Sequence, residues 1–279
     1  MTPHPDDIQA SLREVLHFLA DAGVDEPLDE IAIDRFAAPA ARPTPAQETA
    51  GPAGQDRRQP APPAAPANQR GDVAVPDEAQ AARARELART AANLEELREI
   101  LASFDGCNLK TTAKSLVFAD GNPEASLMLV GEAPGRDEDL EGLPFVGRSG
   151  QLLDRMLAAI GRDRSSAYIA NVIPWRPPGN RTPTPQETEI CRPFIERMIE
   201  LVNPKVLVNL GGPSAKALLN TTEGILRLRG NWRVHTTASG VVVPAMPTLH
   251  PAYLLRNPAH KKLAWRDFLE VKAKLRSLD

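Results

Sequence analysis

The chain has 279 residues, of which 42% are hydrophobic and 25% charged, and a net charge of −3. This length allows one sizeable globular domain with additional segments. No apolar run approaches the roughly 18 residues of a membrane-spanning helix. The first ten residues, MTPHPDDIQA, contain no lysine or arginine, whereas a secretory signal peptide begins with a positively charged region. Two cysteines exclude a disulfide framework. We therefore expect a cytoplasmic protein with no membrane partner.

Charge is divided unevenly along the chain. Residues 1–140 carry a net charge of −12, and residues 141–279 carry +9. A basic half indicates a polyanionic partner. A solvated surface that is simply basic is the alternative.

The first 76 residues differ in composition from the rest. Residues 7–23 place leucines and a valine at helical spacing, which predicts a short amphipathic helix within an N-terminal segment, 1–36, that ends in an acidic stretch. Residues 37–76 contain nine prolines, so they predict a disordered linker. A folded domain is expected over 77–279. The N-terminal helix either docks on this domain or recruits a protein partner.

Helices and strands alternate in the remaining sequence. Helical patterns cover 78–101, 151–160, 185–201, 214–219 and 258–278, and strand patterns cover 127–130, 168–173, 206–210 and 241–247. This alternation predicts an α/β fold of three layers, α/β/α, with a central four-stranded, mostly parallel sheet. Right-handed crossovers then bring the strand-end loops to one edge of the sheet.

Two glycine-rich runs follow the first strand. The first is Gly131-Glu132-Ala133-Pro134-Gly135, and the second is Pro144-Phe145-Val146-Gly147. Glycines allow the backbone to approach a ligand closely. The carboxylate of Glu132 brings chemistry, and the ring of Phe145 can stack on a flat ligand. An ordinary β–α connection with a hydrophobic anchor is the alternative.

Two polar residues mark later strand ends. Asn171 lies in an apolar strand, where its amide is costly to bury unless it is paired. That amide can read the imide edge of a pyrimidine. His250, fixed by Pro251, suits a donor aimed at developing negative charge. A structural asparagine and a structural histidine are the alternatives.

Considered together, these motifs are specific. GEAPG, PFVG, SGQLL, the strand asparagine with RPPGNRTPT, and HPAYLL resemble the family-4 uracil-DNA glycosylases in order and spacing over about 104–279. The resemblance implies a monofunctional DNA glycosylase with this fold, whose partner is uracil-containing DNA. It flips out uracil and hydrolyses the N-glycosidic bond, which leaves an abasic site and initiates base excision repair. We expect a monomer.

The resemblance also implies roles for residues in the uracil pocket. Phe145 stacks on the flipped base and Asn171 recognises its edge, with Gly131 and Tyr168 beside them. His250 stabilises the departing uracil anion.

A polar set surrounds the sugar and the attacking water in the same family pattern. It matches Glu132, Glu138 and Asn180, which we do not rank. A solvated acidic loop is the alternative for Glu138 and Asp139.

Other residues are expected to contact DNA. Leu254, Leu255 and Arg256 resemble a loop that wedges into the minor groove, although the two leucines can instead pack against the final helix. Arg148, Arg176 and Arg181 suit phosphate contacts.

The chain departs from the family at its cofactor. Four cysteines hold an iron–sulfur cluster in family-4 enzymes. Here Cys107 and Cys191 match two of them, and Phe104 and Trp175 stand at the other two positions. Two thiolates are too few for a four-cysteine cluster. We therefore predict no cluster, no other cofactor or metal, and two aromatic rings that fill the vacated space.

Two further functions stay open at this point. One is a non-catalytic module that binds damaged DNA. The other is a glycosylase for hypoxanthine or xanthine, which needs more room beside Phe145 and Tyr168.

Overall fold

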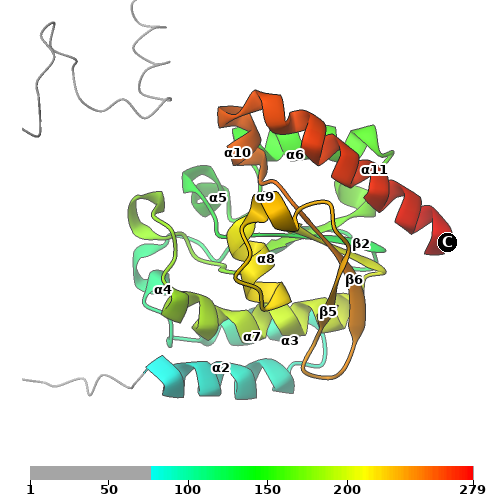
Figure 1. The fold of residues 1–279 in the computed structure, drawn as a ribbon. Helices are drawn as coiled ribbons and strands as arrows, with labels where there is room; N and C mark the ends of the chain where they lie inside the picture. The colour runs from blue at the N-terminus through cyan, green and yellow to red at the C-terminus, as the bar shows by residue number, and fades with distance from the viewer. Residues whose placement is uncertain (1–76, 279) are drawn as a thin grey trace, which may run out of the picture. The chain divides into compact units, whose positions relative to one another are not determined.

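A computed structural model describes residues 77–278 of the chain (Figure 1). The predicted N-terminal segment and proline-rich linker lie outside the described residues. No helix within 77–278 is long and apolar enough to cross a membrane. The elements are α2 (Asp77–Thr90), α3 (Leu94–Ser103), α4 (Leu109–Thr112), β1 (Ala119–Gly121), β2 (Leu127–Gly131), α5 (Arg136–Glu141), α6 (Arg148–Ala159), η1 (Arg164–Ser166), β3 (Tyr168–Asn171), η2 (Pro178–Asn180), α7 (Pro185–Val202), β4 (Val206–Leu210), α8 (Gly212–Leu219), α9 (Ile225–Leu228), β5 (Arg233–Thr236), β6 (Val242–Thr248), α10 (Pro251–Arg256), η3 (Pro258–His260) and α11 (Lys261–Leu278).

The strands form one mixed sheet in the order β1-β3-β2-β4-β6-β5. Strands β2, β3, β4 and β6 are parallel to their neighbours within this group, which confirms the four predicted strands. Two antiparallel edge strands, β1 and β5, were not predicted. They have three and four residues, too few for a hydrophobic period to be visible in the sequence.

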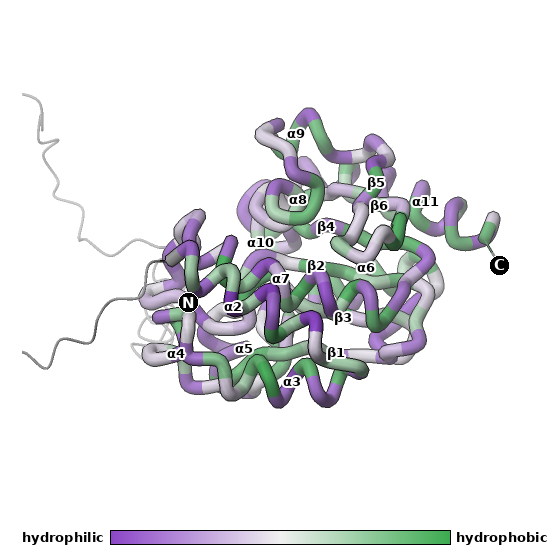
Figure 2. Tube along the Cα trace, turned by 90° about the horizontal axis from the view of Figure 1, so that it is seen from below, coloured by the Kyte–Doolittle hydropathy of each residue, from purple (hydrophilic) through white to green (hydrophobic). Residues whose placement is uncertain are grey.

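Helices cover both faces of the sheet, as the three-layer prediction requires. Apolar residues of α2, α3, α7 and α8 share one core with one side of the strands. Those of α6 and α11 share a second core with the other side. Figure 1 shows these two sets of helices on opposite sides of the sheet, and Figure 2 shows hydrophobic and hydrophilic residues alternating along α2 and α3, as in amphipathic helices.

The single helix predicted over 78–101 is wrong, because the structure has two. Asn93 caps α3: its side chain accepts a hydrogen bond from the Glu96 backbone N–H at 2.9 Å. The Glu96 carboxylate reaches back to the N–H of Ala92 at 2.7 Å. This reciprocal capping ends the first helix and begins the next. The last predicted helix likewise starts with a short 3₁₀ turn before α11.

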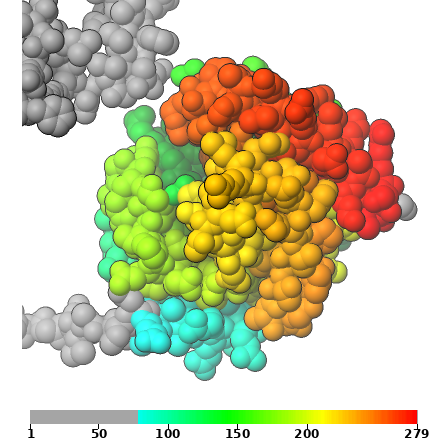
Figure 3. Space-filling view, in the orientation of Figure 1, coloured from blue at the N-terminus to red at the C-terminus, as the bar shows by residue number. Residues whose placement is uncertain are grey.

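The carboxyl ends of the four parallel strands lie at one edge. Gly131 at the end of β2 is in register with Asn171 at the end of β3. The loops that follow β2, β3, β4 and β6 therefore meet at this edge, where ligands bind in open α/β sheets. In Figure 3 the segments after β3, β4 and β6 adjoin one another on the face turned to the viewer.

Candidate active site

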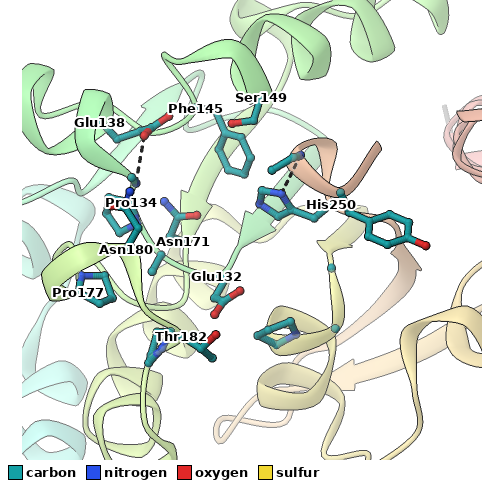
Figure 4. Close-up of a pocket in the computed structure, with 18 of the residues that line it drawn as sticks. Glu132, Pro134, Glu138, Phe145, Ser149, Asn171, Pro177, Asn180, Thr182 and His250 are labelled. Atoms are coloured by element: carbon teal, nitrogen blue, oxygen red, sulfur yellow. Dashed lines mark hydrogen bonds between the residues drawn. The ribbon is translucent and has the colours of Figure 1, made fainter. Parts of the chain in front are cut away.

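A pocket of about 520 Å³ opens at the carboxyl edge of the sheet. It is lined by residues from all four strand-end loops. Eight residues singled out from the sequence are among them: Glu132, Glu138, Phe145, Asn171, Asn180, Arg181, His250 and Arg256. Figure 4 shows the Phe145 ring, the Asn171 amide, the Glu132 carboxylate and the His250 ring around one space.

Phe145 adopts a backbone conformation that is rare for a bulky residue. Its φ is +56°, and it is buried. The Arg164 guanidinium donates a hydrogen bond to its carbonyl oxygen and so holds the strained turn. The ring lies 5.5 Å from the His250 ring, with 29° between their planes. The turn thus presents an aromatic face beside the imidazole.

Gly131 makes this arrangement possible. A Cβ atom there would lie 2.4 Å from the Asn171 Oδ1 atom and 2.6 Å from the Phe145 Cζ atom. Both separations are too short for any side chain. The amide and the ring can therefore approach the strand end only because residue 131 is glycine.

Asn171 carries an unsatisfied acceptor. The residue is buried, and its Oδ1 atom has no hydrogen-bond partner within residues 77–278. A buried polar atom without a partner costs about 1–3 kcal/mol. Since Asn171 lines the pocket, this oxygen is available to a donor on a ligand. A satisfied structural asparagine is not what the structure shows.

His250 is held as a neutral donor. Its Nδ1 atom accepts a hydrogen bond from the Ala252 backbone N–H at 3.1 Å, at the N-terminus of α10 (Figure 4). The proton of the neutral ring therefore sits on Nε2. Burial, assisted by the positive charge of Arg256, lowers the pKa of His250 to about 4. At neutral pH the ring is uncharged.

The two glutamates of the first loop differ in their surroundings. Burial raises the pKa of Glu132, and no hydrogen bond to its carboxylate is present among the residues described. Both oxygens of Glu138 accept backbone N–H groups, from Gly135 at 3.0 Å and Gly147 at 3.2 Å. Glu138 thus ties the two glycine runs together, and Glu132 is the carboxylate left for a ligand or water.

Asp139 is not part of a solvated acidic loop. It is buried, and its Oδ1 atom accepts the N–H groups of Lys114 at 2.8 Å and Ser115 at 3.1 Å. Its other oxygen lies 3.9 Å from the guanidinium of Arg176.

Arg176, which was predicted to contact a phosphate, lies against polar side chains of its own chain. Its Nε atom donates a hydrogen bond to the Asn180 Oδ1 atom at 2.7 Å. Asn180 ends the 3₁₀ turn η2 with φ of +54° and lines the pocket. Sequence reasoning missed this contact because nothing in the local pattern distinguishes it from an arginine exposed to solvent.

Tyr168, which was predicted to lie beside the base, is not among the residues that line the pocket. It starts β3, three residues before Asn171, and packs in the core shared with α7. Burial raises its pKa to about 12. Tyr253 instead lines the pocket, with its hydroxyl 2.8 Å from the His260 Nδ1 atom.

The predicted DNA-contacting residues divide into buried and exposed ones. Leu254 is buried against Leu249 and Ala264, so it packs against α11 as the alternative reading held, while Leu255 is 36% exposed. Arg181 lies on the pocket rim and pairs with Glu187. Arg256 also lies on this rim, and Arg148 is the first residue of α6.

The pocket is also lined by residues that were not singled out from the sequence, among them Ser149, Thr182, Pro213 and Ile225. Two of them, Ser149 and Thr182, stand inside the motifs SGQLL and RPPGNRTPT. Their position in a motif was the only available signal.

Phe104, Cys107, Trp175 and Cys191 form what we call the cysteine core. All four are buried. The Cys191 thiol donates to the Cys107 sulfur at 3.7 Å, which raises the pKa of Cys191 and lowers that of Cys107. Phe104 also packs on Phe194, with ring centroids 5.1 Å apart.

This core does not fit a four-thiolate iron–sulfur cluster. It offers two sulfur ligands, and aromatic rings stand at the other two positions. Within residues 77–278 no group of three or more histidine, cysteine, aspartate or glutamate side chains is placed to hold a metal ion.

Comparison with known proteins identifies similar sequences. The model of the Uracil DNA glycosylase superfamily matches residues 118–269. The chain is 39% identical to the Type-4 uracil-DNA glycosylase of Archaeoglobus fulgidus over 184 residues, which cover 64% of this chain and 92% of the relative. It is 37% identical to that of Sulfurisphaera tokodaii (64% and 84% covered) and 39% identical to that of Thermotoga maritima (60% and 88%).

Proposed function

Because the chain belongs to the Uracil DNA glycosylase superfamily, we propose that the pocket at the carboxyl edge of its sheet excises uracil with Phe145, Asn171, His250, Glu132 and Asn180. The chain is a uracil-DNA glycosylase, a hydrolytic enzyme of DNA repair. The observation that carries the residue assignment is the buried, unpartnered Asn171 oxygen beside a neutral imidazole and an aromatic ring.

Asn171 selects the base. A uracil flipped out of DNA stacks on Phe145 and presents an N3–H donor and an O4 acceptor. The Asn171 Oδ1 atom accepts from N3–H, and its amide N–H donates to O4. Cytosine carries an acceptor at N3 and an amino donor at C4, so both hydrogen bonds are lost. An acceptor then faces an acceptor at N3, and a donor faces a donor at C4.

His250 stabilises the leaving group. As the C1′–N1 bond breaks, its electron pair goes to the uracil ring, and negative charge develops on O2. The Nε2–H of a neutral His250 donates to that oxygen without prior loss of a proton. A low imidazole pKa keeps the ring in this form at neutral pH.

Glu132 acts on the sugar side. Its carboxylate is free of hydrogen bonds in the described part of the chain, so it can stabilise positive charge on the oxocarbenium-like sugar and accept a hydrogen bond from the attacking water. Water adds its oxygen to C1′ and loses one proton, and the uracil anion gains one. Asn180 lies on the same pocket wall, while Glu138 holds the loop.

DNA is bound along the pocket rim. We assign phosphate contacts to Arg181, Arg256 and Arg148, and the wedge to Leu255, the exposed leucine of the predicted pair. Affinity then falls as salt rises, because phosphate contacts release counterions. We expect the enzyme to act as a monomer.

The enzyme works without an iron–sulfur cluster. The cysteine core supports this assignment, because it offers two thiols in contact with each other and has buried aromatic rings, Phe104 and Trp175, at the positions that match the other two family cysteines. Pure protein should contain no stoichiometric iron or acid-labile sulfide. Stoichiometric amounts of both would refute the assignment.

Excision from a labelled oligonucleotide with one deoxyuridine tests the proposal. Wild type should produce alkali-sensitive abasic sites. Asn171→Ala and His250→Ala should lose at least 100-fold in single-turnover rate, which is about 2.7 kcal/mol of barrier, with unchanged melting temperature. Binding without cleavage by wild type would instead indicate a damage-binding module. Cleavage of a hypoxanthine or xanthine oligonucleotide at a comparable rate would overturn the assignment to uracil.

A further inference from the structure

A chain of three polar residues leads from α5 to the loop after β3 and ends in the pocket. The Asp139 carboxylate is buried and anchored by two backbone N–H groups, from Lys114 and Ser115. Its second oxygen lies 3.9 Å from the Arg176 guanidinium. Arg176 in turn donates to the Asn180 side chain at 2.7 Å. A fixed carboxylate thus holds an arginine, which holds an asparagine on the pocket wall.

This contact decides which way the Asn180 amide faces. Arginine has only donors, so the atom that it touches must be the amide oxygen. The Asn180 NH₂ group is therefore the part left for a ligand. The backbone supports the same orientation, since Asn180 is held in the left-handed region by the turn after Pro177 and Pro178.

We propose that Arg176 is a positioning residue that fixes Asn180 as a hydrogen-bond donor toward the sugar and water. The proposal rests on the proposed function, in which Asn180 belongs to the polar set. The two residues then have different roles. Glu132 accepts a hydrogen bond from the water, and Asn180 donates one to a lone pair of the water or the sugar. A donor aimed at a lone pair of the water and an acceptor for one of its O–H groups together orient the molecule.

Two roles for Arg176 predict different kinetics. A phosphate contact acts on binding, so its loss weakens the DNA complex and lowers the salt dependence of affinity. A positioning role acts through Asn180, so its loss slows the chemical step and has no effect once Asn180 is gone.

The test is a double-mutant cycle with Arg176→Met, which matches the arginine in length but has no donor. Single-turnover excision and DNA affinity are measured for R176M, N180A and the double variant, with melting temperatures to check folding. We expect R176M to slow excision 10- to 100-fold with DNA affinity within twofold. The double variant should be no slower than N180A. Arg176→Lys, which restores one donor, should excise faster than R176M and recover most of the lost rate.

Arg181→Met is the matched control from the same loop. We assign Arg181 to a phosphate, so its loss should weaken DNA affinity and lower the salt dependence of that affinity. The same behaviour in R176M, additive effects in the cycle, no effect of R176M, or no recovery by R176K would each overturn the proposal. If N180A excises at the wild-type rate, the positioning role has no target and is refuted. The loss of activity in H250A would then still support the proposed function separately.

Discussion

The pocket and the cysteine core lie next to each other in the chain but differ in what they contain. Trp175 is buried in the cysteine core, and Arg176, the next residue, reaches Asn180 in the pocket. The pocket keeps the polar residues of the family pattern, including an unpartnered amide oxygen. The cysteine core keeps two thiols and has gained two aromatic rings.

This difference shows how chemical and structural roles tolerate substitution. A hydrogen bond to a reacting atom needs a particular donor or acceptor at a particular place, so in the proposed mechanism we expect other residue types at positions 171 and 250 to fail. A structural core needs filled volume and fixed segments, which different residues can supply.

The largest effect is expected where the two regions meet. Trp175→Ala removes a fully buried ring and should lower the free energy of unfolding by about 3–5 kcal/mol. The protein that remains folded should also excise uracil more slowly than wild type, because the next residue positions Asn180. Chemical denaturation and single-turnover excision measure the two effects. Phe104→Ala is the control: a similar loss of stability with a smaller loss of rate. An equal loss of rate in both variants would contradict the link between the regions.

A smaller change in the pocket should affect activity alone. Gly131→Ala places a methyl group 2.4 Å from the Asn171 oxygen and 2.6 Å from the Phe145 ring. One of them must move, so we expect excision to fall about 100-fold, or about 2.7 kcal/mol of barrier. Gly161→Ala is a control for adding a methyl group, because its Cβ would meet no atom within 4 Å, although the positive φ there adds strain. Full activity of G131A would contradict the close approach.

The pH dependence of excision separates Glu132 from His250. In the proposed mechanism the active form has Glu132 ionised and His250 neutral. Burial raises the pKa of Glu132 above 4.5 and lowers that of His250 to about 4. On acidification Glu132 therefore gains its proton first, and the rate should fall up to tenfold per pH unit below its raised pKa. Glu132→Gln should be slow and should lose this limb. A limb that persists in E132Q would assign it to another group.

The smallest effect is expected from the thiols. Cys107→Ala and Cys191→Ala each remove one sulfur from a packed core, and should cost about 1 kcal/mol of stability. Because neither thiol reaches the pocket, excision should stay within twofold of wild type. A loss of more than tenfold in folded protein would show that the cysteine core contributes to the chemistry.

Local pattern and residue chemistry were enough to predict part of this molecule. The hydrophobic runs at β2, β3, β4 and β6 predicted the parallel sheet, and the residues after them predicted the pocket. Only two of the four positions that match the family's cluster ligands are cysteines, which predicted an incomplete set of thiolate ligands.

Contacts between distant segments could not be predicted in this way and are visible only in the folded chain. Tyr168 and Asn171 share one strand, yet one lies in the core and the other lines the pocket, because they stand at opposite ends of β3. The fold brings the Arg176 side chain between Asp139 and Asn180, a contact that no local pattern predicts. Glu138 and Glu132 have the same chemistry, and only the backbone N–H groups around them decide which is free. The partners of a side chain depend on how the whole chain folds, and the local hydrophobic pattern of a sequence carries no information about them.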